Sequence, residues 1–292
     1  MIYTVTLNPA LDHTIAPGEE RMEPGGKGLN VSKTLRAFGI PSVAATLSAK
    51  KRGRTLCRLA MEAGLTIRAF PAAGETRVNR KVFDGKQVTE YNQPGPPLDT
   101  EAFDALCAWL RQTLCPEDAL ALCGSLPPAA AADTYAVLCR AVGCRTIVDT
   151  SGEALGASLA ARPWAVKPNL AELTQWAGTE LLTADSRAAA MQAMCAAGAQ
   201  RVLLSMGSAG AMLATDEGIW SANAPDVQVR GTVGAGDAMT AVLVSAPEAE
   251  PPALLRRCIA AGSAAAMQPG SAPPLSADLE ALLPRISVQR LT

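Results

Sequence analysis

A short apolar run followed by a longer segment with helical periodicity recurs along most of this 292-residue chain. In the helical segment after the first run, Val31, Leu35 and Phe38 recur at the spacing of one helix face. Repeated strand–helix units of this kind imply a parallel sheet with helices on both faces, so the sequence predicts an α/β fold. The apolar runs are Ile2–Asn8, 41–47, Asp118–Gly124, Arg145–Thr150, Trp164–Asn169 and Arg201–Gly207.

Polar or glycine residues stand at the carboxyl ends of these runs. Ligands of open α/β sheets bind beyond the carboxyl ends of the strands, where neighbouring loops meet. We therefore expect the functional site along one rim of the sheet, formed by Asn8, Ser125, Asp149, 167–169 and 205–207.

One region departs from the alternation. In Thr76–Asn92, polar and apolar residues alternate around Asp84–Gly85–Lys86, which predicts a β-hairpin. Such a hairpin forms either a small lid or an antiparallel edge addition without a role. No repeat, linker or low-complexity tract divides the chain, so we expect a single domain over residues 1–292.

Charge and cysteine content exclude several classes of function. The net charge is −1, and the basic cluster Lys50–Arg54 is short, which argues against a nucleic-acid partner and favours a solvated loop. The eight cysteines form no CxxC pair and His13 is the only histidine, so a zinc site is not expected. We expect no membrane partner and a cytoplasmic location with reduced thiols, because neither a signal peptide nor a long apolar span is present.

The segment GTVGAGDAM (231–239) follows a strand-like run and opens a helical one. It is not a dinucleotide fingerprint, because Met239 stands where the third glycine is required. Gly234, Ala235 and Gly236 would leave bare amides at a helix N-terminus, which is a physical anion site. Asp237 in the first turn is then either a catalytic carboxylate or an acidic residue that only stabilises the helix dipole.

Two further segments admit a functional and a structural interpretation. In PGGKGLN (24–30), Lys27 and Asn30 would bind an oxygen-rich ligand, or the glycines form an ordinary turn. In KPNLAEL (167–173), Asn169 and Glu172 would hold Mg²⁺, or they form a capping box at the start of a helix. The segment SMGSAGAM (205–212) would line the rim of the site, or it is only a tight turn between strands.

Taken together, the motifs resemble those of the ribokinase-like (PfkB) carbohydrate kinases, in that family's order and over nearly the whole chain. Within this family, the phosphosugar branch is indicated by TLNP, TRVN and VKPN. The segment PWAVKPN is most similar to the 1-phosphofructokinase group of that branch. The motifs are TLNPALD (6–12), GGKGLNV (25–31), TRVN (76–79), GSLPP (124–128), DTSGEAL (149–155), VKPNLAEL (166–173), SMGSAGAM (205–212) and TVGAGDAM (232–239).

The resemblance implies a three-layer αβα sandwich with a mostly parallel central sheet and a small, shortened β lid near residues 12–24 and 74–95. It implies ATP and Mg²⁺ as cofactors, with Asp237 as the base and the amides of Gly234, Ala235 and Gly236 as an anion hole. Mg²⁺ would be organised by Asn169 and Glu172. The nucleotide would be bound by Lys167, Asn169, Ser205, Gly207, Gly210, Thr232 and Gln268.

For the acceptor, the resemblance implies that Asp12, Gly25, Gly26 and Asn30 bind sugar hydroxyls. The cations Lys27 and Arg77, with Asn79 and Lys81, would bind the phosphate already on the substrate. The expected reaction is phosphorylation of fructose 1-phosphate to fructose 1,6-bisphosphate. Alternative acceptors are tagatose 6-phosphate and fructose 6-phosphate, and a protein of another class would be a catalytically weak sugar-phosphate binder or regulator.

Three features depart from the family pattern. Only twelve residues separate Asp12 from Gly25, which is fewer than the lid strands of the family usually occupy. The resemblance also implies that two copies form a homodimer through this lid. Ser48–Arg54 (SAKKRGR) stands in place of the usual glycine-rich substrate loop. Gln268 falls where relatives often carry an asparagine on the adenine side.

Overall fold

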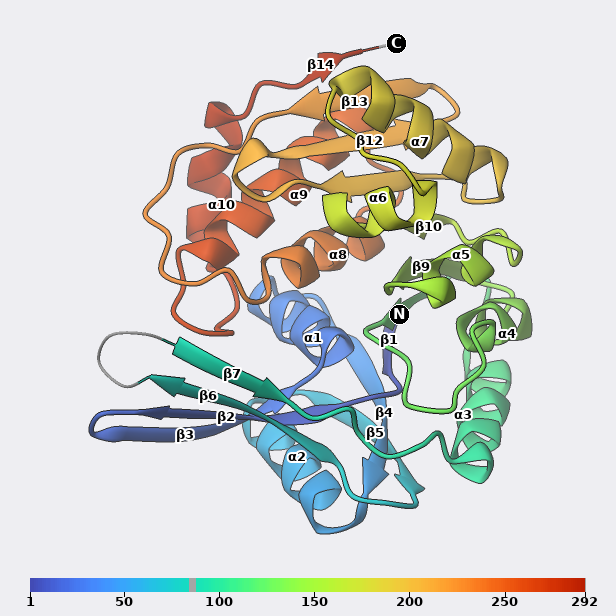
Figure 1. The fold of residues 1–292 in the computed structure, drawn as a ribbon, viewed down its shortest axis with the longest axis vertical. Coiled ribbons are helices and arrows are strands. Elements are labelled where there is room, and N and C mark those ends of the chain that lie inside the picture. Colours follow the sequence, from blue (N-terminus) through green and yellow to red (C-terminus); the bar gives the residue numbers. More distant parts are fainter. Residues whose placement is uncertain (84–87, 292) are drawn as a thin grey trace.

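A computed structural model describes residues 1–83 and 88–291, in which one large sheet and one small sheet are present (Figure 1). The large sheet has ten strands in the order β14-β13-β12-β11-β10-β9-β8-β1-β4-β5. Strands β5 to β11 of this order run parallel, and β12, β13 and β14 continue the sheet antiparallel. The strands are β1 (Ile2–Thr6), β4 (Ser42–Ala49), β5 (Thr66–Ala72), β8 (Ala119–Cys123), β9 (Arg145–Asp149), β10 (Ala165–Val166), β11 (Val202–Ser205), β12 (Ala211–Thr215), β13 (Gly218–Ala222) and β14 (Gln289–Arg290).

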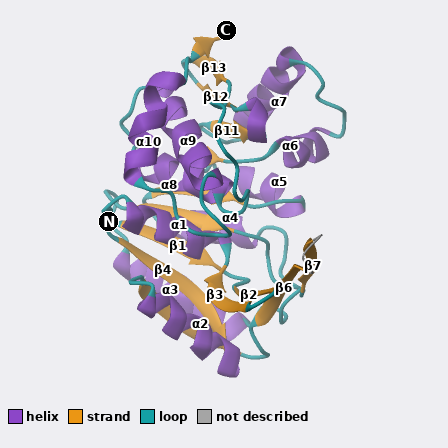
Figure 2. Ribbon diagram, turned by 90° about the vertical axis from the view of Figure 1, so that its left-hand side faces the viewer, coloured by secondary structure: helices purple, strands orange, loops and turns teal. Residues whose placement is uncertain are grey.

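Helices cover both faces of this sheet, because its central strands are apolar on both sides. On one face pack α1 (Lys27–Ala37), α8 (Ala235–Ser245), α9 (Pro251–Ala266) and α10 (Ser276–Leu282), with α2 (Lys50–Glu62) beside them. On the other face pack α3 (Thr100–Thr113), α4 (Thr134–Ala141), α5 (Glu153–Leu159), α6 (Leu170–Ala177) and α7 (Ala184–Ala196). Figure 2 shows α9 and α10 on the opposite side of β11–β13 from α6 and α7. The predicted α/β sandwich is confirmed.

The small sheet has four strands in the order β3-β2-β6-β7, namely β3 (Glu19–Gly25), β2 (Ala10–Ala16), β6 (Arg77–Phe83) and β7 (Val88–Asn92). It projects from the main body (Figure 1). The twelve residues between Asp12 and Gly25 suffice for an antiparallel hairpin, in which Asp12 lies opposite Glu23. The strands β6 and β7 are antiparallel as expected, and their predicted turn at Asp84–Lys86 lies outside the described residues.

Two local features differ from, or refine, the sequence interpretation. The basic cluster Lys50–Arg54 is not a loop, because it forms the first turns of α2 and Gly53 packs against Ser48. The segment at 205–212 is a turn, as expected, with the short 3₁₀ helix η1 (Gly207–Ala209) joining β11 to β12. A second 3₁₀ helix, η2 (Leu283–Arg285), follows α10.

Within residues 1–83 and 88–291, no helix combines the length and the apolar character that spanning a membrane requires.

Candidate active site

A cavity of about 700 Å³ opens at the carboxyl edge of the large sheet. Its walls come from the first residue of α1, the segments after β10 and β11, the loop before α8, and the faces of α8 and α9. Site residues predicted from the sequence make up a large part of this lining: Lys27, Lys167, Asn169, Ser205, Gly207, Gly210, Thr232, Ala235, Gly236 and Asp237.

The N-terminus of α8 faces the cavity without a side-chain cap. Gly234 is its N-cap in the left-handed conformation, with φ of 85°, and Ala235, Gly236 and Asp237 form the first turn. The amides of a first helical turn have no partner inside the helix, and the helix dipole adds positive potential there. This end of α8 therefore offers amide donors to an anion in the cavity.

Asp237 is a buried carboxylate in this turn, with 7% of its surface exposed. The side-chain amide of Asn30 donates to its Oδ2 at 2.9 Å. Burial raises the pKa of Asp237, and the charge of Asp149 raises it further, to about 6, against the lowering effects of Lys27, Asn30 and Lys167. Asp237 is therefore ionised at neutral pH with a proton affinity well above that of an ordinary aspartate, as a general base requires.

A second buried carboxylate, Asp149 at the end of β9, lies beside it and binds two lysines. Lys27 Nζ is 2.8 Å from Asp149 Oδ1, and Lys167 Nζ is 3.2 Å from Asp149 Oδ2. The hydroxyl of Thr240 also donates to Oδ2, at 2.8 Å. Burial alone would raise the pKa of Asp149, but Lys167, Lys27 and Thr240 together lower it to about 2.

Lys27 remains a cation in this environment. Its burial opposes the charge, but the charge and hydrogen bond of Asp149 together with the charges of Asp237 and Glu172 outweigh that effect and raise the pKa of Lys27. The sequence did not indicate that Asp149 pairs with both lysines or that Thr240 donates to Asp149. Asp149 was only one of several polar strand ends, and Thr240 gave no signal beyond its place one turn after Asp237.

The remaining acceptor-side candidates lie on the small sheet. Asn79 Nδ2 donates to Asp12 Oδ1 at 2.9 Å, and burial raises the pKa of Asp12. Arg77 donates to the carbonyls of Asn8 and Gln93 and to Asn79 Oδ1, while Lys81 pairs with Glu90 at 3.0 Å. These interactions build a polar face on β2 and β6.

Gly25 and Gly26 join this face to α1. A Cβ on Gly25 would lie 2.3 Å from Asp12 Oδ2, so the carboxylate packs directly on the glycine backbone. Gly26 is the N-cap of α1 with φ of 129°, a conformation that favours glycine.

Asn169 and Glu172 form the capping box of α6. Asn169 Oδ1 accepts from the amide of Glu172 at 2.9 Å, and Glu172 Oε2 accepts from the amide of Asn169 at 2.8 Å. In the described residues, no three His, Cys, Asp or Glu side chains are grouped closely enough to hold a metal ion. One carboxylate and one amide fit a Mg²⁺ ion that is bound mainly by phosphate oxygens and waters.

Gln268 takes a different position from the other nucleotide candidates. It follows α9 and donates to Asp278 Oδ2 at 3.0 Å, and it is not among the described residues that line the large cavity. The side chain of Gln268 therefore does not line the cavity with Ser205, Gly207 and Thr232, although its backbone carbonyl lies close to Gly231, the residue before Thr232.

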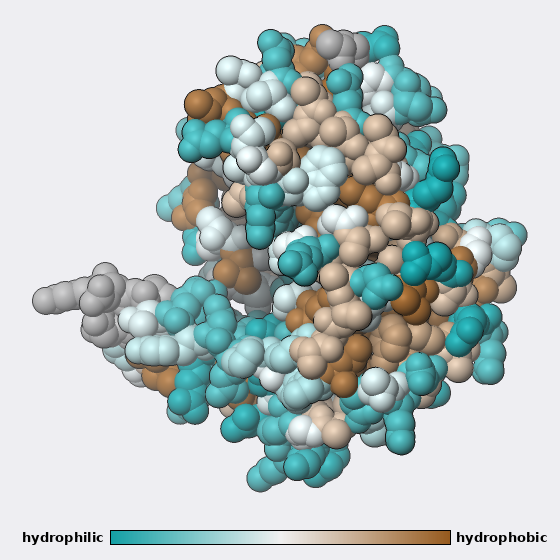
Figure 3. Space-filling model, turned by 45° about the vertical axis from the view of Figure 1, so that its right-hand side comes forward, coloured by the Kyte–Doolittle hydropathy of each residue, from teal (hydrophilic) through white to brown (hydrophobic). Residues whose placement is uncertain are grey.

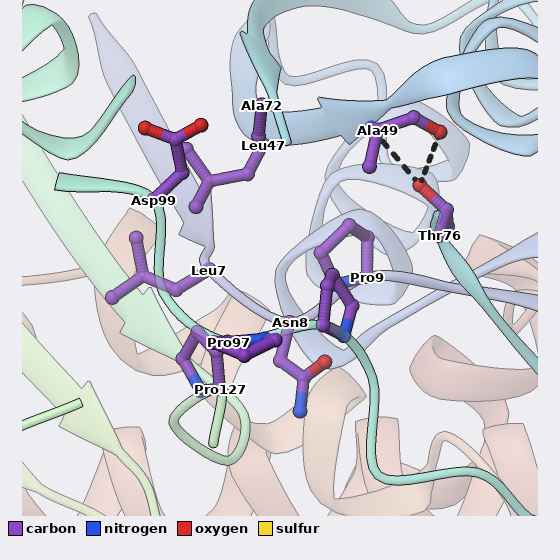
Figure 4. A pocket seen from close by; sticks show the side chains of 11 residues that line it. Leu7, Asn8, Pro9, Leu47, Ala49, Ala72, Thr76, Pro97, Asp99 and Pro127 are labelled. Carbon is purple, nitrogen blue, oxygen red and sulfur yellow. Dashed lines mark hydrogen bonds between the residues drawn. The ribbon is translucent and has the colours of Figure 1, made fainter. Parts of the chain in front are cut away.

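A second, much smaller cavity lies where β1 and β4 end (Figure 4). It is lined by Leu7, Pro9, Leu47 and prolines 96, 97 and 127, among others. Its volume of about 20 Å³ holds about one water molecule. It is too small for a sugar or a nucleotide, so the large cavity is the candidate site.

Comparison with known proteins finds a family match over most of the chain. Residues 1–274 match the pfkB family of carbohydrate kinases. The chain is 38% identical to the 1-phosphofructokinase of Rhodobacter capsulatus over 262 residues, which cover 84% of this chain and 83% of that one. It is 32% identical to the 1-phosphofructokinase of Bacillus subtilis over the full length of both chains.

Among solved structures, phosphofructokinase-2 from Escherichia coli in complex with fructose-6-phosphate superposes with a TM-score of 0.88. The two chains are 30% identical, and the match covers 97% of this chain and 98% of that one.

Proposed function

Because the chain belongs to the pfkB family of carbohydrate kinases, we propose that it transfers the γ-phosphoryl group of ATP to the 6-hydroxyl of fructose 1-phosphate. The product is fructose 1,6-bisphosphate. The observation that carries the proposal is a buried carboxylate, Asp237, in the first turn of an uncapped helix at the wall of a large cavity. The similarity to 1-phosphofructokinases supports fructose 1-phosphate as the acceptor.

In this mechanism Asp237 accepts the proton of the attacking sugar hydroxyl. Its raised pKa suits that task, since it is ionised at pH 7 and still binds a proton readily. The amides of Gly234, Ala235 and Gly236 donate to the phosphoryl oxygens during transfer, where stabilisation of charge supplies most of the catalysis.

Lys27 was expected to bind the phosphate of the acceptor, but Asp149 holds its ammonium group next to that of Lys167 in the large cavity. We therefore assign Lys27, together with Lys167, to the phosphates of the nucleotide. Asn169 and Glu172 would hold Mg²⁺, which when bound neutralises charge on the phosphates. Ser205, Gly207, Gly210 and Thr232 line the rest of the nucleotide path. We keep Gln268 outside this set, because its amide is bonded to Asp278.

The acceptor lies between the cavity and the polar face of the small sheet, which acts as a lid on the single kinase domain. Asp12 binds sugar hydroxyls together with the backbone at Gly25 and Gly26. Asn79, expected beside the acceptor phosphate, donates to Asp12 and so joins the hydroxyl-binding group. Asn30, expected to bind a hydroxyl, instead donates to Asp237. Arg77 and Lys81 bind the existing phosphate, for which Lys81 exchanges its partner Glu90. A kinase for fructose 6-phosphate or tagatose 6-phosphate would use the same groups with the sugar reversed.

We further propose that two copies assemble through the outer face of this lid, in a cytoplasmic enzyme. Met22, His13, Arg80 and Tyr91 lie opposite one another across four strands and form one row on that face. Met22 is 41% exposed and Tyr91 60%, so the row presents two large apolar side chains that a second copy would cover.

The replacement Asp237→Asn tests the chemical role directly. It preserves shape and the neighbouring contacts but removes the base, so we expect kcat to fall by about 10²- to 10⁴-fold. ATP and sugar binding, measured by calorimetry, should remain within a few-fold of wild type. Equal turnover by both proteins would remove Asp237 from the mechanism.

A further inference from the structure

Lys33 connects the lid to Asp237 through a chain of hydrogen bonds. Its Nζ donates to the carbonyl of Pro24 on β3 at 2.7 Å and to Asn30 Oδ1 at 3.3 Å. Asn30 in turn donates through Nδ2 to Asp237 Oδ2 at 2.9 Å. Lys33 and Asn30 are three residues apart on α1, so they share one face of that helix.

The chemistry of these groups fixes the orientation of the Asn30 amide. An ammonium group only donates hydrogen bonds, and a carboxylate only accepts them. An amide between the two must therefore turn its oxygen to Lys33 and its NH₂ group to Asp237. Asn30 is buried, with 8% of its surface exposed, so water does not compete freely for these contacts.

We propose that Lys33 is a positioning residue that holds the Asn30 amide as a donor to Asp237 and so keeps the base ionised at neutral pH. Without Lys33 the amide is free to turn its oxygen toward Asp237. That orientation favours the protonated carboxyl, because a carboxylate facing an oxygen is repelled and a carboxylic acid can donate to it. The inference rests on the proposed role of Asp237 as the base.

The other charged or titratable groups around Asp237 stay in place when Lys33 is replaced. They come from several elements: Lys27 from α1, Cys123 from β8, Asp149 from β9 and Lys167 after β10. Helix α9, which packs on α8, turns Arg256 and Arg257 to solvent, and its Cys258 thiol donates to the Met239 carbonyl. Burial lowers the pKa of Lys33, and the charges of Glu23, Asp12 and Asp237 counteract that effect.

The test is the pH profile of kcat/KM for Lys33→Met. The base must be deprotonated, so activity rises with pH through the pKa of Asp237, and a higher pKa moves this acid limb to higher pH. We expect the acid limb to move up by about half a pH unit to one pH unit, so that kcat/KM on the limb is roughly three- to tenfold lower than in the wild type. Above pH 8, kcat/KM should be close to that of the wild type. Lys33→Arg keeps the donors and should restore the wild-type limb.

A double-mutant cycle with Asn30→Ala separates this mechanism from a direct effect of the lysine charge. If Lys33 acts through Asn30, then Lys33→Met causes no further shift once the amide is gone. The proposal is overturned if Lys33→Met shifts the acid limb equally in the wild-type and the Asn30→Ala backgrounds. It is also overturned if Lys33→Met keeps the acid limb of the wild type. Both substrates carry phosphates that themselves titrate near pH 6, so only differences between variants at identical substrate are compared.

Two controls complete the design. Arg140→Met removes an exposed basic side chain of α4, on the other face of the large sheet, and should leave the limb unchanged. If Lys33→Met does not fold, Lys33→Ala replaces it, since alanine favours the helix. Carboxyl ¹³C NMR of Asp237 measures the same pKa change without turnover. An inactive wild type would thus refute the proposed function, whereas an unchanged Asp237 pKa in the variant refutes only the role of Lys33.

Discussion

Asp149 and Asp237 are two buried carboxylates whose pKa values move in opposite directions. Two lysines and a threonine hydroxyl lower that of Asp149 to about 2, whereas burial and the neighbouring negative charge raise that of Asp237 to about 6. Such a divergence assigns different tasks to chemically equal side chains. Asp149 stays ionised and pairs with Lys27 and Lys167, whereas the raised pKa of Asp237 suits the proton exchange that we propose for it.

Gly25 offers a test of the acceptor side at the scale of one methyl group. In Gly25→Ala, the new Cβ would lie 2.3 Å from Asp12 Oδ2 and 2.4 Å from Cγ, so the carboxylate must move. We expect KM for the acceptor to rise by about tenfold or more, since displacement of a binding group by about 1 Å is costly. KM for ATP should stay the same, because the nucleotide cavity is not lined by this strand.

The matched control is Gly143→Ala, where the added methyl group meets no heavy atom within 4 Å. Steady-state kinetics with each substrate varied in turn distinguish the two variants. Unchanged acceptor KM in Gly25→Ala would show that Asp12 is not a sugar ligand.

At the residue scale, the sequence was informative where local geometry determines a position. Glycines before a helix imply bare amides at its N-terminus. Asn169 three residues before Glu172 admits a capping box or a Mg²⁺ site, and the capping box is present. Pairings between distant residues were not predictable in this way. Lys27 and Asp149 are 122 residues apart, and only the assembled sheet brings them together.

The lid sheet is the element whose two faces differ most. Asp12 and Asn79 lie on its inner face, and side chains on a strand alternate, so the row that contains Met22 and Tyr91 faces outward. In the space-filling view the surface of the projecting lid that is turned to the body is mainly hydrophilic, with brown apolar atoms beneath (Figure 3). In the proposed enzyme, substrate binding and assembly would therefore use opposite faces of the lid.

The proposed assembly predicts that Met22→Asp is monomeric. This replacement puts a carboxylate in the interface, where a buried charge costs several kcal/mol unless it is paired, so the dimer should dissociate at micromolar concentration. Sedimentation equilibrium measures the mass. Leu182→Asp is the control, because Leu182 is 76% exposed and lies outside the lid. A wild-type monomer, or a dimer that tolerates Met22→Asp, would contradict a lid interface.

For the whole molecule, the alternation of apolar runs and helical segments predicted the parallel sheet, because each unit repeats the same local pattern. It did not predict the end of the sheet, where β12, β13 and β14 turn antiparallel, since an apolar run does not specify its direction. The basic cluster 50–54 is helical and not a loop, because it continues into residues whose face at Leu56 and Ala60 is buried. Its charges are exposed on α2, which is compatible with a helix.

The central claim is that this chain phosphorylates fructose 1-phosphate at the expense of ATP. The most direct measurement is ADP release by the purified protein with fructose 1-phosphate, fructose 6-phosphate, tagatose 6-phosphate and the unphosphorylated sugars, with ³¹P NMR of the products. The account predicts the highest kcat/KM for fructose 1-phosphate and a product phosphorylated at both ends. A higher kcat/KM with another acceptor, or no release with any of them, would contradict it.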